Sequence, residues 1–336
     1  MIDRPALLVA DLERIPAVLR AHATAPPLTL AAALGHRRPE RLVLTGLGSS
    51  RFAALAVESA FRAGGLEVIV EHASTSRPAP VDERTLVVGI SSSGATQETV
   101  AAVARARAAG ASTLAITNQP GSALAAAAGG VLTLDAADEA SGVASLTFAA
   151  TIAALTRLAA ALGADIDALG LLEAAARAAD EAIADRPGWL PAAADLLGTG
   201  VAIHVIGDAA ALGDAEQAAL LFRECPRLES DAMDAGDWLH VGIYTALPGY
   251  RALLLAGSPY DAEIVGTIHD RGGRVVAIGP APVGPTPERA ERADLTIQLP
   301  PSAAGDPVVR SLVEPIVAAS IAAELWHRAS AETTPG

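Results

Sequence analysis

Two short segments rich in glycine and hydroxyl groups each open a predicted helix, and both have the composition of a phosphate-binding turn. Their residues are Gly48, Ser49 and Ser50 in the first segment and Ser91, Ser92, Ser93, Gly94 and Thr96 in the second. Backbone N–H groups and the positive end of the dipole at a helix N-terminus attract anions, and Ser and Thr hydroxyls add donors without bulk. The pattern therefore predicts a site for a phosphate monoester. The alternative is that these residues only cap the two helices.

A later segment, RECPRLESDAMDAGDWLH, contains the candidates for acid–base chemistry. Glu224 lies at the end of a predicted helix, and His240 follows sixteen residues later. A carboxylate can remove the proton from a carbon next to a carbonyl, and a histidine can transfer a proton to or from an oxygen. Taken by themselves, the two residues favour a plainer interpretation, a solvated glutamate and a surface or packing histidine.

The elements that must position these residues alternate regularly. Apolar runs predict strands at residues 42–45, 66–70, 85–90 and 113–117, with helices at 52–63 and 98–109. Strands that alternate with helices indicate a parallel, doubly wound sheet with helices on both faces. The two hydroxyl segments follow neighbouring strands at their carboxyl ends, so we expect them to border one crevice.

The α/β pattern restarts in the second half of the chain. Residues 146–197 are helical in pattern, and then strands at 202–206, 251–255 and 274–278 accompany a helix at 209–223. The repeat of roughly 160 residues indicates two copies of one fold. The predicted organisation is an N-terminal helical segment at 1–40, a first phosphate-binding domain at 41–165, a helical linker at 166–195 and a second domain at 196–336.

Composition excludes several classes of function. The formal net charge of −14 repels polyanions, so nucleic acid is not an expected partner. Cys225 is the only cysteine, which excludes an internal disulfide and a cysteine-cluster metal site and predicts a buried small residue. No apolar run reaches the roughly 18 residues of a membrane span, and the first residues carry acids where a signal peptide carries bases. We expect a cytoplasmic protein without membrane partner, metal or cofactor.

The first glycine-rich turn also resembles part of a dinucleotide fingerprint. Gly46 and Gly48 follow the first predicted strand, and Glu71 ends the second. However, Arg51 occupies the third glycine position and would crowd a pyrophosphate, and the fingerprint does not require the second hydroxyl segment. The sequence therefore favours a phosphate monoester over a dinucleotide.

The segments GLGSSRFAALA, ISSSGATQETVAAVARARAAGASTLAITNQPGSALA and GVAS resemble successive phosphosugar-binding segments of the sugar isomerase (SIS) superfamily. The similarity is to the isomerase half of glucosamine-6-phosphate synthase and its relatives, and it covers most of residues 40–280. It implies two tandem SIS domains of the flavodoxin-like α/β type, with one phosphate site in each chain. The implied phosphate-binding residues are Ser49, Ser50, Ser91, Ser92, Ser93 and Thr96, and the implied sugar-binding residues are Gly48, Val143 and Ser145.

The same resemblance gives roles to the acid–base candidates. It implies that Glu224 is the base and that His240, contributed by the neighbouring subunit of a homodimer, assists ring opening. The implied function is an enzyme that opens glucosamine 6-phosphate or N-acetylglucosamine 6-phosphate and abstracts the C2 proton, with aldose–ketose isomerisation or deamination as the outcome. The alternatives are a dehydratase or lyase that eliminates the 3-substituent, and a non-catalytic phosphosugar sensor.

The sequence also departs from the synthase pattern. Leu221 and Thr147 stand where the synthase has lysines, and the end of the chain, ELWHRASAETTPG, contains none. No glutaminase domain precedes the fold, so we do not expect glutamine-dependent synthesis. The first forty residues leave no room for the helix-turn-helix domain of SIS sensors, which favours an enzyme.

Overall fold

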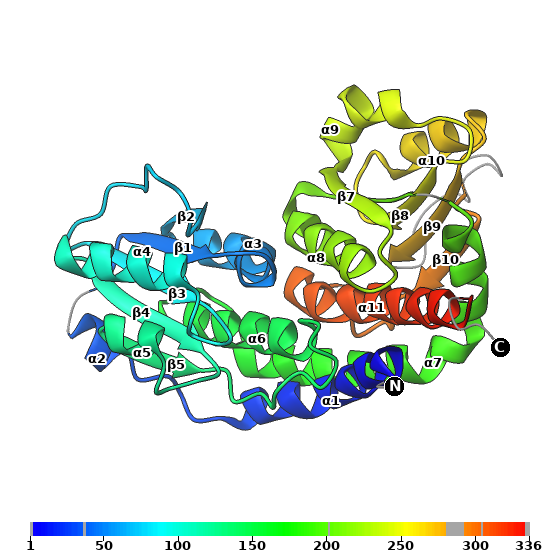
Figure 1. Ribbon diagram of the computed structural model, residues 1–336. Helices are drawn as coiled ribbons and strands as arrows, with labels where there is room; N and C mark the ends of the chain where they lie inside the picture. Colours follow the sequence, from blue (N-terminus) through cyan, green and yellow to red (C-terminus); the bar gives the residue numbers. More distant parts are fainter. Residues whose placement is uncertain (1–2, 36–37, 201, 280–291, 304, 333–336) are drawn as a thin grey trace. The chain divides into compact units, whose positions relative to one another are not determined.

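The computed structural model describes residues 3–35, 38–200, 202–279, 292–303 and 305–332. It contains two five-stranded parallel sheets, each covered by its own helices (Figure 1). The chain divides into two compact units, which are described separately. The first-sheet unit comprises Ala17–Asp138 and Leu146–Glu173, and the second-sheet unit comprises the described parts of 1–16, 139–145 and 174–336.

The first-sheet unit has the strand order β2-β1-β3-β4-β5. The strands are β1 (Arg41–Gly46), β2 (Glu67–His72), β3 (Thr85–Ile90), β4 (Ser112–Thr117) and β5 (Gly130–Thr133). The helices that lie wholly in this unit are α2 (Ala31–Leu34), α3 (Ser49–Ala63), α4 (Gln97–Ala108), α5 (Ala123–Ala127) and α6 (Leu146–Ala161). The central strand β3 is buried along its whole length, as its run of β-branched and apolar residues requires.

The second-sheet unit has the strand order β10-β9-β8-β6-β7. The strands are β6 (Ala202–Gly207), β7 (Glu229–Asp234), β8 (Arg251–Leu255), β9 (Arg274–Gly279) and β10 (Leu295–Gln298). The helical elements are η1 (Ala209–Ala211), α8 (Leu212–Glu224), α9 (Ala235–His240), η2 (Gly242–Thr245), α10 (Asp261–Asp270) and α11 (Pro307–Glu332), while α1 (Arg4–Thr24) and α7 (Ala168–Gly198) contribute residues to both units. Helix α8 packs against α11, and Trp238, Leu254 and Ile264 belong to the core on one side of the sheet.

The doubly wound α/β fold predicted from the sequence is confirmed, with the inner strands within one or two residues of their predicted positions. Three strands were not predicted, namely β5, β7 and β10, and all three lie at sheet edges. An edge strand has one strand neighbour and needs fewer apolar residues, and β7 (ESDAMD) is largely polar. The predicted domain limits stay a prediction, since the compact units combine segments that are distant in the sequence.

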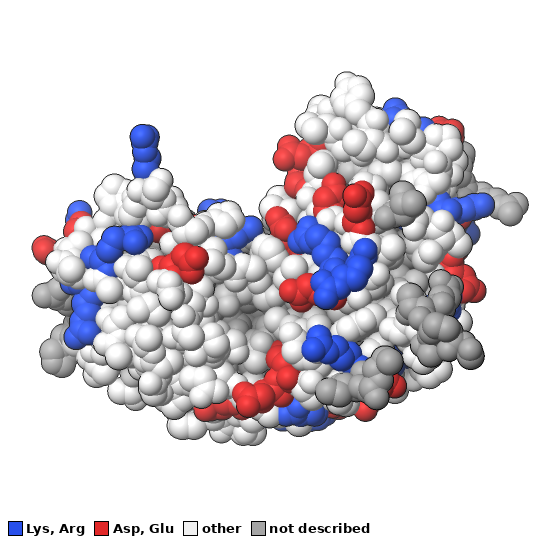
Figure 2. All heavy atoms as spheres, in the orientation of Figure 1, with Lys and Arg blue, Asp and Glu red and all other residues white. Residues whose placement is uncertain are grey.

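The surface and the single cysteine follow from the composition. Figure 2 shows acidic and basic side chains in small mixed groups on the face drawn, without a wide basic patch among the described residues. Cys225 is 1% exposed, as predicted, and burial raises the pKa of its thiol to about 12. In the described parts of the chain, no helix is long and apolar enough to cross a lipid bilayer.

Candidate functional site

The two hydroxyl-rich turns follow the adjacent parallel strands β1 and β3. Thr45 of β1 pairs with Gly89 of β3, and a Cβ on Gly46 would lie 3.0 Å from the carbonyl oxygen of Ile90. The carboxyl ends of the two strands are therefore in direct contact. The strand order reverses at this point, because β2 lies on one side of β1 and β3 on the other. Open α/β sheets bind ligands at such a topological switch point.

The first turn leaves its hydroxyls available. Gly48 has a φ of 52°, in the left-handed region that favours glycine, and it is the N-cap residue of α3. Ser49 and Ser50 form the beginning of α3, where backbone N–H groups have no acceptor within the helix. Both serines are half-buried, and neither hydroxyl has a hydrogen-bond partner among the described residues. Hydroxyl and N–H donors are thus both free to bind an anion.

The second turn is held together by its buried first serine. Ser91 is 4% exposed, its hydroxyl lies 3.0 Å from that of Thr96, and it accepts a hydrogen bond of 3.2 Å from the N–H of Gly94. Gly94 has a φ of 62°, and a Cβ there would lie 2.0 Å from the Ser122 hydroxyl oxygen, so only glycine fits. Ser91 therefore shapes the turn.

The remaining serines of the second turn are more accessible. Ser93 is exposed, and its hydroxyl accepts a hydrogen bond of 3.3 Å from the N–H of Ala95. Ser92 is half-buried, and its carbonyl oxygen accepts hydrogen bonds from the Thr117 hydroxyl and the Asn118 N–H. The carbonyl of Ser92 is thereby fixed against the next strand, while Ser93 lies at the surface of the turn.

The capping alternative finds no support in the hydrogen bonds at the two helix starts. The N-cap residues are Gly48 for α3 and Thr96 for α4, and neither makes a side-chain capping hydrogen bond. By contrast, Ser122 caps α5 by accepting a hydrogen bond of 3.3 Å from Ala125. The hydroxyls at the switch point of the first sheet are therefore not consumed by capping.

A buried aspartate fixes the loop that contains the GVAS segment. The carboxylate of Asp11, which is 0% exposed, accepts hydrogen bonds from the N–H groups of Ala140 and Ser141 at 3.0 and 2.9 Å and from the Ser141 hydroxyl at 2.8 Å. Val143 and Ser145, the candidate sugar-binding residues of this loop, are 6% and 7% exposed. The loop thus has a defined conformation within the second-sheet unit.

Ser145 is engaged by a second acidic residue of the same loop. Its N–H donates to one carboxylate oxygen of Glu139 at 2.9 Å, and its hydroxyl donates to the other at 3.3 Å. The hydroxyl can therefore turn toward a sugar only by giving up a long hydrogen bond. The role of Ser145 in sugar binding stays a prediction.

Helix α8 connects this loop with the candidate base. Gln217 donates a hydrogen bond of 2.7 Å to the carbonyl oxygen of Ala144. Gln217 and Glu224 are seven residues apart on α8, which is two helical turns, so both lie on one side of the helix. The sequence reasoning missed Gln217, although its spacing to Glu224 was visible.

The environment of Glu224 suits a general base. The residue ends α8 and is half-buried. Burial raises the pKa of its carboxyl group, and the charges of Arg227 and Arg223 offset part of that rise. No hydrogen bond occupies the carboxylate in the described residues. A free carboxylate with a raised pKa is a stronger base than an exposed one.

The side chains of His240 and Glu224 are not hydrogen-bonded to one another. His240 ends α9 and is exposed, and its ring makes no hydrogen bond with Glu224 or with any other described residue. Large exposed apolar side chains follow it in the chain, namely Val241 at 60%, Tyr244 at 79% and Leu247 at 64% exposure. Of the predicted site residues, the structure brings the two phosphate turns together in the first-sheet unit. Glu224, His240, Val143 and Ser145 belong to the second-sheet unit.

The comparisons with known proteins agree with this architecture. A model of the SIS domain family matches residues 37–162. The chain belongs to the SIS superfamily. The glutamine–fructose-6-phosphate aminotransferase (isomerizing) of Aeropyrum pernix is 31% identical over 320 residues, which are 89% of this chain and 49% of that protein. Its counterpart in Halobacterium salinarum is 31% identical over 256 residues, covering 72% of this chain and 41% of that protein. This SIS chain thus spans about half the length of these relatives or less.

Several solved structures share the fold over nearly the whole chain. The C-terminal domain of the Francisella tularensis glucosamine-fructose-6-phosphate aminotransferase has a TM-score of 0.76 at 15% identity and covers 96% of both chains. The glucosamine-6-phosphate deaminase of Thermotoga maritima has a TM-score of 0.70 at 16% identity, covering 96% of this chain and 94% of that one. The tagatose-6-phosphate ketose/aldose isomerase of Escherichia coli has a TM-score of 0.72 at 18% identity, covering 98% and 91%.

Proposed function

We propose that this SIS protein is an enzyme that opens a hexosamine 6-phosphate and abstracts its C2 proton, with isomerisation or deamination as the outcome. The observation that carries the proposal is the pair of helix-opening turns at the switch point of the first sheet, whose hydroxyls make no capping hydrogen bonds. Such turns fit a phosphate monoester. Several relatives and fold neighbours are named for reactions of sugar phosphates, which supports the same substrate class.

The proposed chemistry uses two side chains of the second-sheet unit. His240 moves the proton between O1 and O5 when the ring opens, and the new C1 carbonyl acidifies the proton on C2. Glu224 removes that proton and leaves an enolic intermediate. With an amine at C2, return of the proton to C1 gives a ketimine, which water hydrolyses to the ketose and ammonia. With an acetamide at C2, this route is blocked, and loss of the 3-hydroxyl becomes the easier outcome.

Elimination of the 3-substituent is a second candidate reaction, because the sequence contains no lysine. All 24 residues counted as Lys or Arg are arginines, so no lysine of this sequence can form a Schiff base with the open-chain sugar. Leu221, which is 1% exposed, lies on the same side of α8 as Glu224 and offers no charge. Isomerisation requires that the negative charges developing on O1 and O2 be stabilised. Fewer basic side chains to stabilise them favour elimination over isomerisation.

The test is turnover in deuterated water, followed by NMR. Glucosamine 6-phosphate, N-acetylglucosamine 6-phosphate and fructose 6-phosphate are each incubated with the protein, with unphosphorylated glucosamine as the control. We expect exchange at C2 of a phosphorylated aminosugar together with ketose and ammonia, or with an eliminated product. Return of every sugar unchanged, despite measurable binding, would contradict an enzyme and favour a phosphosugar sensor.

We further propose a homodimer with shared active sites, and the surface around His240 supports it. His240 has no partner in its own chain among the described residues, and the apolar Val241, Tyr244 and Leu247 beside it are more than half exposed. Large exposed apolar side chains that cluster at one place commonly mark a protein interface. A second copy would bury them and bring His240 to a neighbouring site.

Mixing two inactive variants tests the shared site. Glu224→Gln and His240→Ala proteins should each be inactive, and after subunit exchange the mixture should recover up to about a quarter of wild-type activity, because random pairing at equal amounts makes half the dimers hybrid. Exchange is checked independently by native mass spectrometry of differently tagged subunits. No recovery despite complete exchange would mean that His240 acts within its own chain or not at all.

A further inference from the structure

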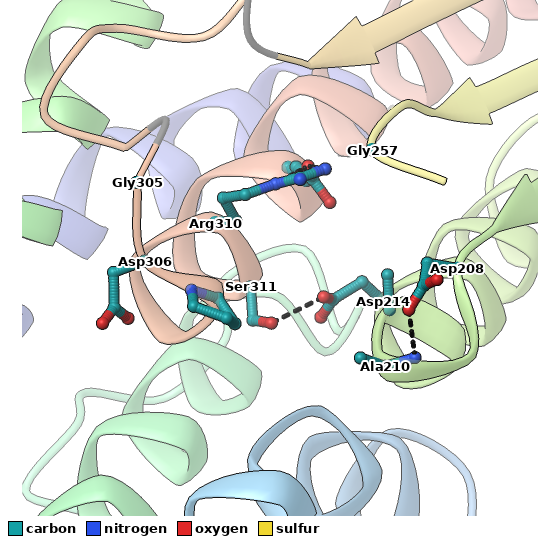
Figure 3. Close-up of a pocket in the computed structure, with 11 residues that line it drawn as sticks. Asp208, Ala210, Asp214, Gly257, Gly305, Asp306, Arg310 and Ser311 are labelled. Carbon is teal, nitrogen blue, oxygen red and sulfur yellow. Dashed lines mark hydrogen bonds and ion pairs between the residues drawn. The ribbon is translucent and has the colours of Figure 1, made fainter. Parts of the chain in front are cut away.

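The second sheet has its own crevice at the switch point, and that crevice is acidic. A cavity of about 190 Å³ lies beyond the carboxyl ends of β6 and β8, between the first turns of α8 and α11 (Figure 3). The polar side chains that line it are Asp208, Asp214, Asp306, Arg310, Ser311 and Glu314. It corresponds in the repeated fold to the switch point of the first sheet, where the hydroxyl-rich turns lie, but it is lined by four carboxyl groups and one guanidinium, a formal charge of −3 when all are ionised.

Two of these carboxylates are buried and incompletely paired. Asp214 is 2% exposed, and one of its oxygens accepts a hydrogen bond of 2.6 Å from the Ser311 hydroxyl, while Oδ1 has no partner. Glu314 is 1% exposed, and its Oε1 is bound by Arg310 at 2.5 Å, while Oε2 has no partner. Leaving a buried charged acceptor unpaired is costly. Figure 3 shows Asp214 and Ser311 pointing toward one another from α8 and α11.

The rest of the cavity does not supply the missing donors. Asp208 and Asp306 accept hydrogen bonds from helix-start N–H groups, those of Ala210 at 2.8 Å and Val308 at 2.8 Å, so the positive helix ends are already matched by acids. Arg310 also donates to the carbonyl oxygen of Ala256 and is fixed beside Glu314. Burial and the charge of Glu314 raise the pKa of Asp214, and burial raises that of Glu314 to about 7. When both carboxyl groups are ionised, the cavity is therefore short of positive charge and of hydrogen-bond donors.

Size and chemistry limit the ligand. A phosphate would be repelled by the excess negative charge, and 190 Å³ is less than the roughly 300–1,000 Å³ of sites for drug-sized molecules. Divalent metals require six or more oxygen ligands or tight clusters of His, Cys and carboxylates, and no such cluster occurs among the described residues. A small cation whose N–H groups can reach both free carboxylate oxygens meets both requirements.

We propose that this acidic crevice binds an ammonium-type cation, either ammonium itself or the protonated amine of a small molecule. One N–H donates to Oδ1 of Asp214 and another to Oε2 of Glu314, the two buried oxygens without partners. The positive charge offsets the excess of carboxylates, and the ligand ties the first turn of α8 to α11. The crevice belongs to the second-sheet unit and the sugar-phosphate turns belong to the first-sheet unit, and the test requires no sugar.

The test compares cations at equal ionic strength and at pH 8, which is above the pKa of about 7 that burial gives Glu314. Thermal unfolding is measured in ammonium, methylammonium, potassium and tetramethylammonium chlorides, because a ligand that binds only the folded protein raises Tm in a saturable way. We expect ammonium, methylammonium or both to raise Tm above the potassium value, and tetramethylammonium, which has no N–H, to have no such effect. A larger rise in Tm with ammonium than with methylammonium indicates that the site binds free ammonium, and the reverse indicates an amine. The cation that binds, ¹⁵N-ammonium or ¹⁵N-methylammonium, should also give a protected N–H proton signal with the wild-type protein.

Variants locate the effect in the cavity. Asp214→Asn and Glu314→Gln should each weaken the ammonium-type response at least tenfold, whereas Asp195→Asn, which removes an exposed carboxylate of the same unit, should leave it unchanged. If a buried variant fails to fold, the wild-type NMR signal still decides. Equal stabilisation by potassium, or no protected signal from either ¹⁵N-ammonium or ¹⁵N-methylammonium at saturating salt, would overturn the proposal and mean that the two carboxyl groups share only a proton or a water.

Discussion

Replacing Glu224 with glutamine should abolish deuterium exchange at C2 and the formation of every product, while phosphosugar binding stays nearly unchanged. Glutamine keeps the size of the side chain but cannot accept the C2 proton as a carboxylate does. The substituted residue ends α8 in the second-sheet unit, whereas the proposed phosphate turns belong to the first-sheet unit. Loss of a general base typically costs 10²–10⁴-fold in rate, and here no other carboxylate is proposed at C2.

The measurement is the exchange rate at C2 by proton NMR, with binding followed by calorimetry. Glu229→Gln is the matched control, because Glu229 is an exposed glutamate on the next strand, β7. Its exchange rate should equal that of the wild type. If the Glu224→Gln protein still exchanged the C2 proton at the wild-type rate, the proposed mechanism would be wrong.

The pH dependence follows from the same carboxylate. A general base works only when it is ionised, so activity is lost as the pH falls through its pKa. Because burial raises the pKa of Glu224, the acid limb of kcat/KM should lie above the ordinary pKa of a glutamate. Weakening the opposing positive charge with Arg227→Gln should move that limb further upward, since Arg227 lowers the pKa. An unchanged limb would contradict the assignment of Glu224 to it.

The parts of the molecule that local sequence determines were predictable. Buried strands such as β3 form continuous apolar runs, and the glycine and serine residues that follow β1 and β3 are contiguous in the sequence. Since parallel strands end at the same edge of a sheet, the two turns were expected at one edge. The order along the chain did not show that β1 and β3 are direct neighbours, because β2 lies between them in the sequence and on the far side of β1 in the sheet. The edge strand β7 was missed because its alternation of acidic and small residues resembles a polar loop.

The contacts that fix the loop around Val143 and Ser145 could not be derived from spacing. Asp11 accepts hydrogen bonds from residues about 130 positions away, and Gln217 reaches the carbonyl of Ala144 across 73 positions. Neither residue differs in its local pattern from an ordinary surface acid or amide on a helix. The tertiary fold buries the carboxylate of Asp11, and a buried carboxylate needs hydrogen-bond donors. The loop that contains Ala140 and Ser141 supplies these donors.

The acidic crevice of the second sheet is another feature that could not be predicted from local sequence patterns. Its residues come from the end of β6 and from the starts of α8 and α11, so Asp214 and Glu314 are a hundred positions apart. The internal repeat indicated a second copy of the fold, and the family resemblance implied only one phosphate site in the chain. The cavity at the switch point of the second sheet is lined by carboxyl groups partly because α11 contributes Glu314. None of the motifs recognised in the sequence includes α11.

Replacing Ser91 and Ser93 together with alanine should weaken binding of the sugar phosphate by about 100-fold or more. A hydrogen bond to a charged group contributes about 1.5–3 kcal/mol, and each 1.4 kcal/mol is a factor of ten in affinity. The two serines act differently: Ser91 is buried and orders the turn through Thr96 and the Gly94 N–H, whereas Ser93 is exposed at its surface. Ser91→Ala should therefore also lower Tm, and Ser93→Ala should weaken binding while Tm stays nearly constant.

The separation of these effects makes the assignment testable. Calorimetric titration with the reactive sugar phosphate, and with inorganic phosphate as the minimal anion, should give the same loss for Ser93→Ala, because the serine is proposed to contact only the phosphate. Ser112→Ala is the matched control, since Ser112 begins β4 at the opposite, amino-terminal edge of the same sheet. Its affinity should match the wild type. Unchanged affinity in the double variant, with the fold intact by thermal unfolding, would move the phosphate away from the two turns and remove the basis for placing the sugar there.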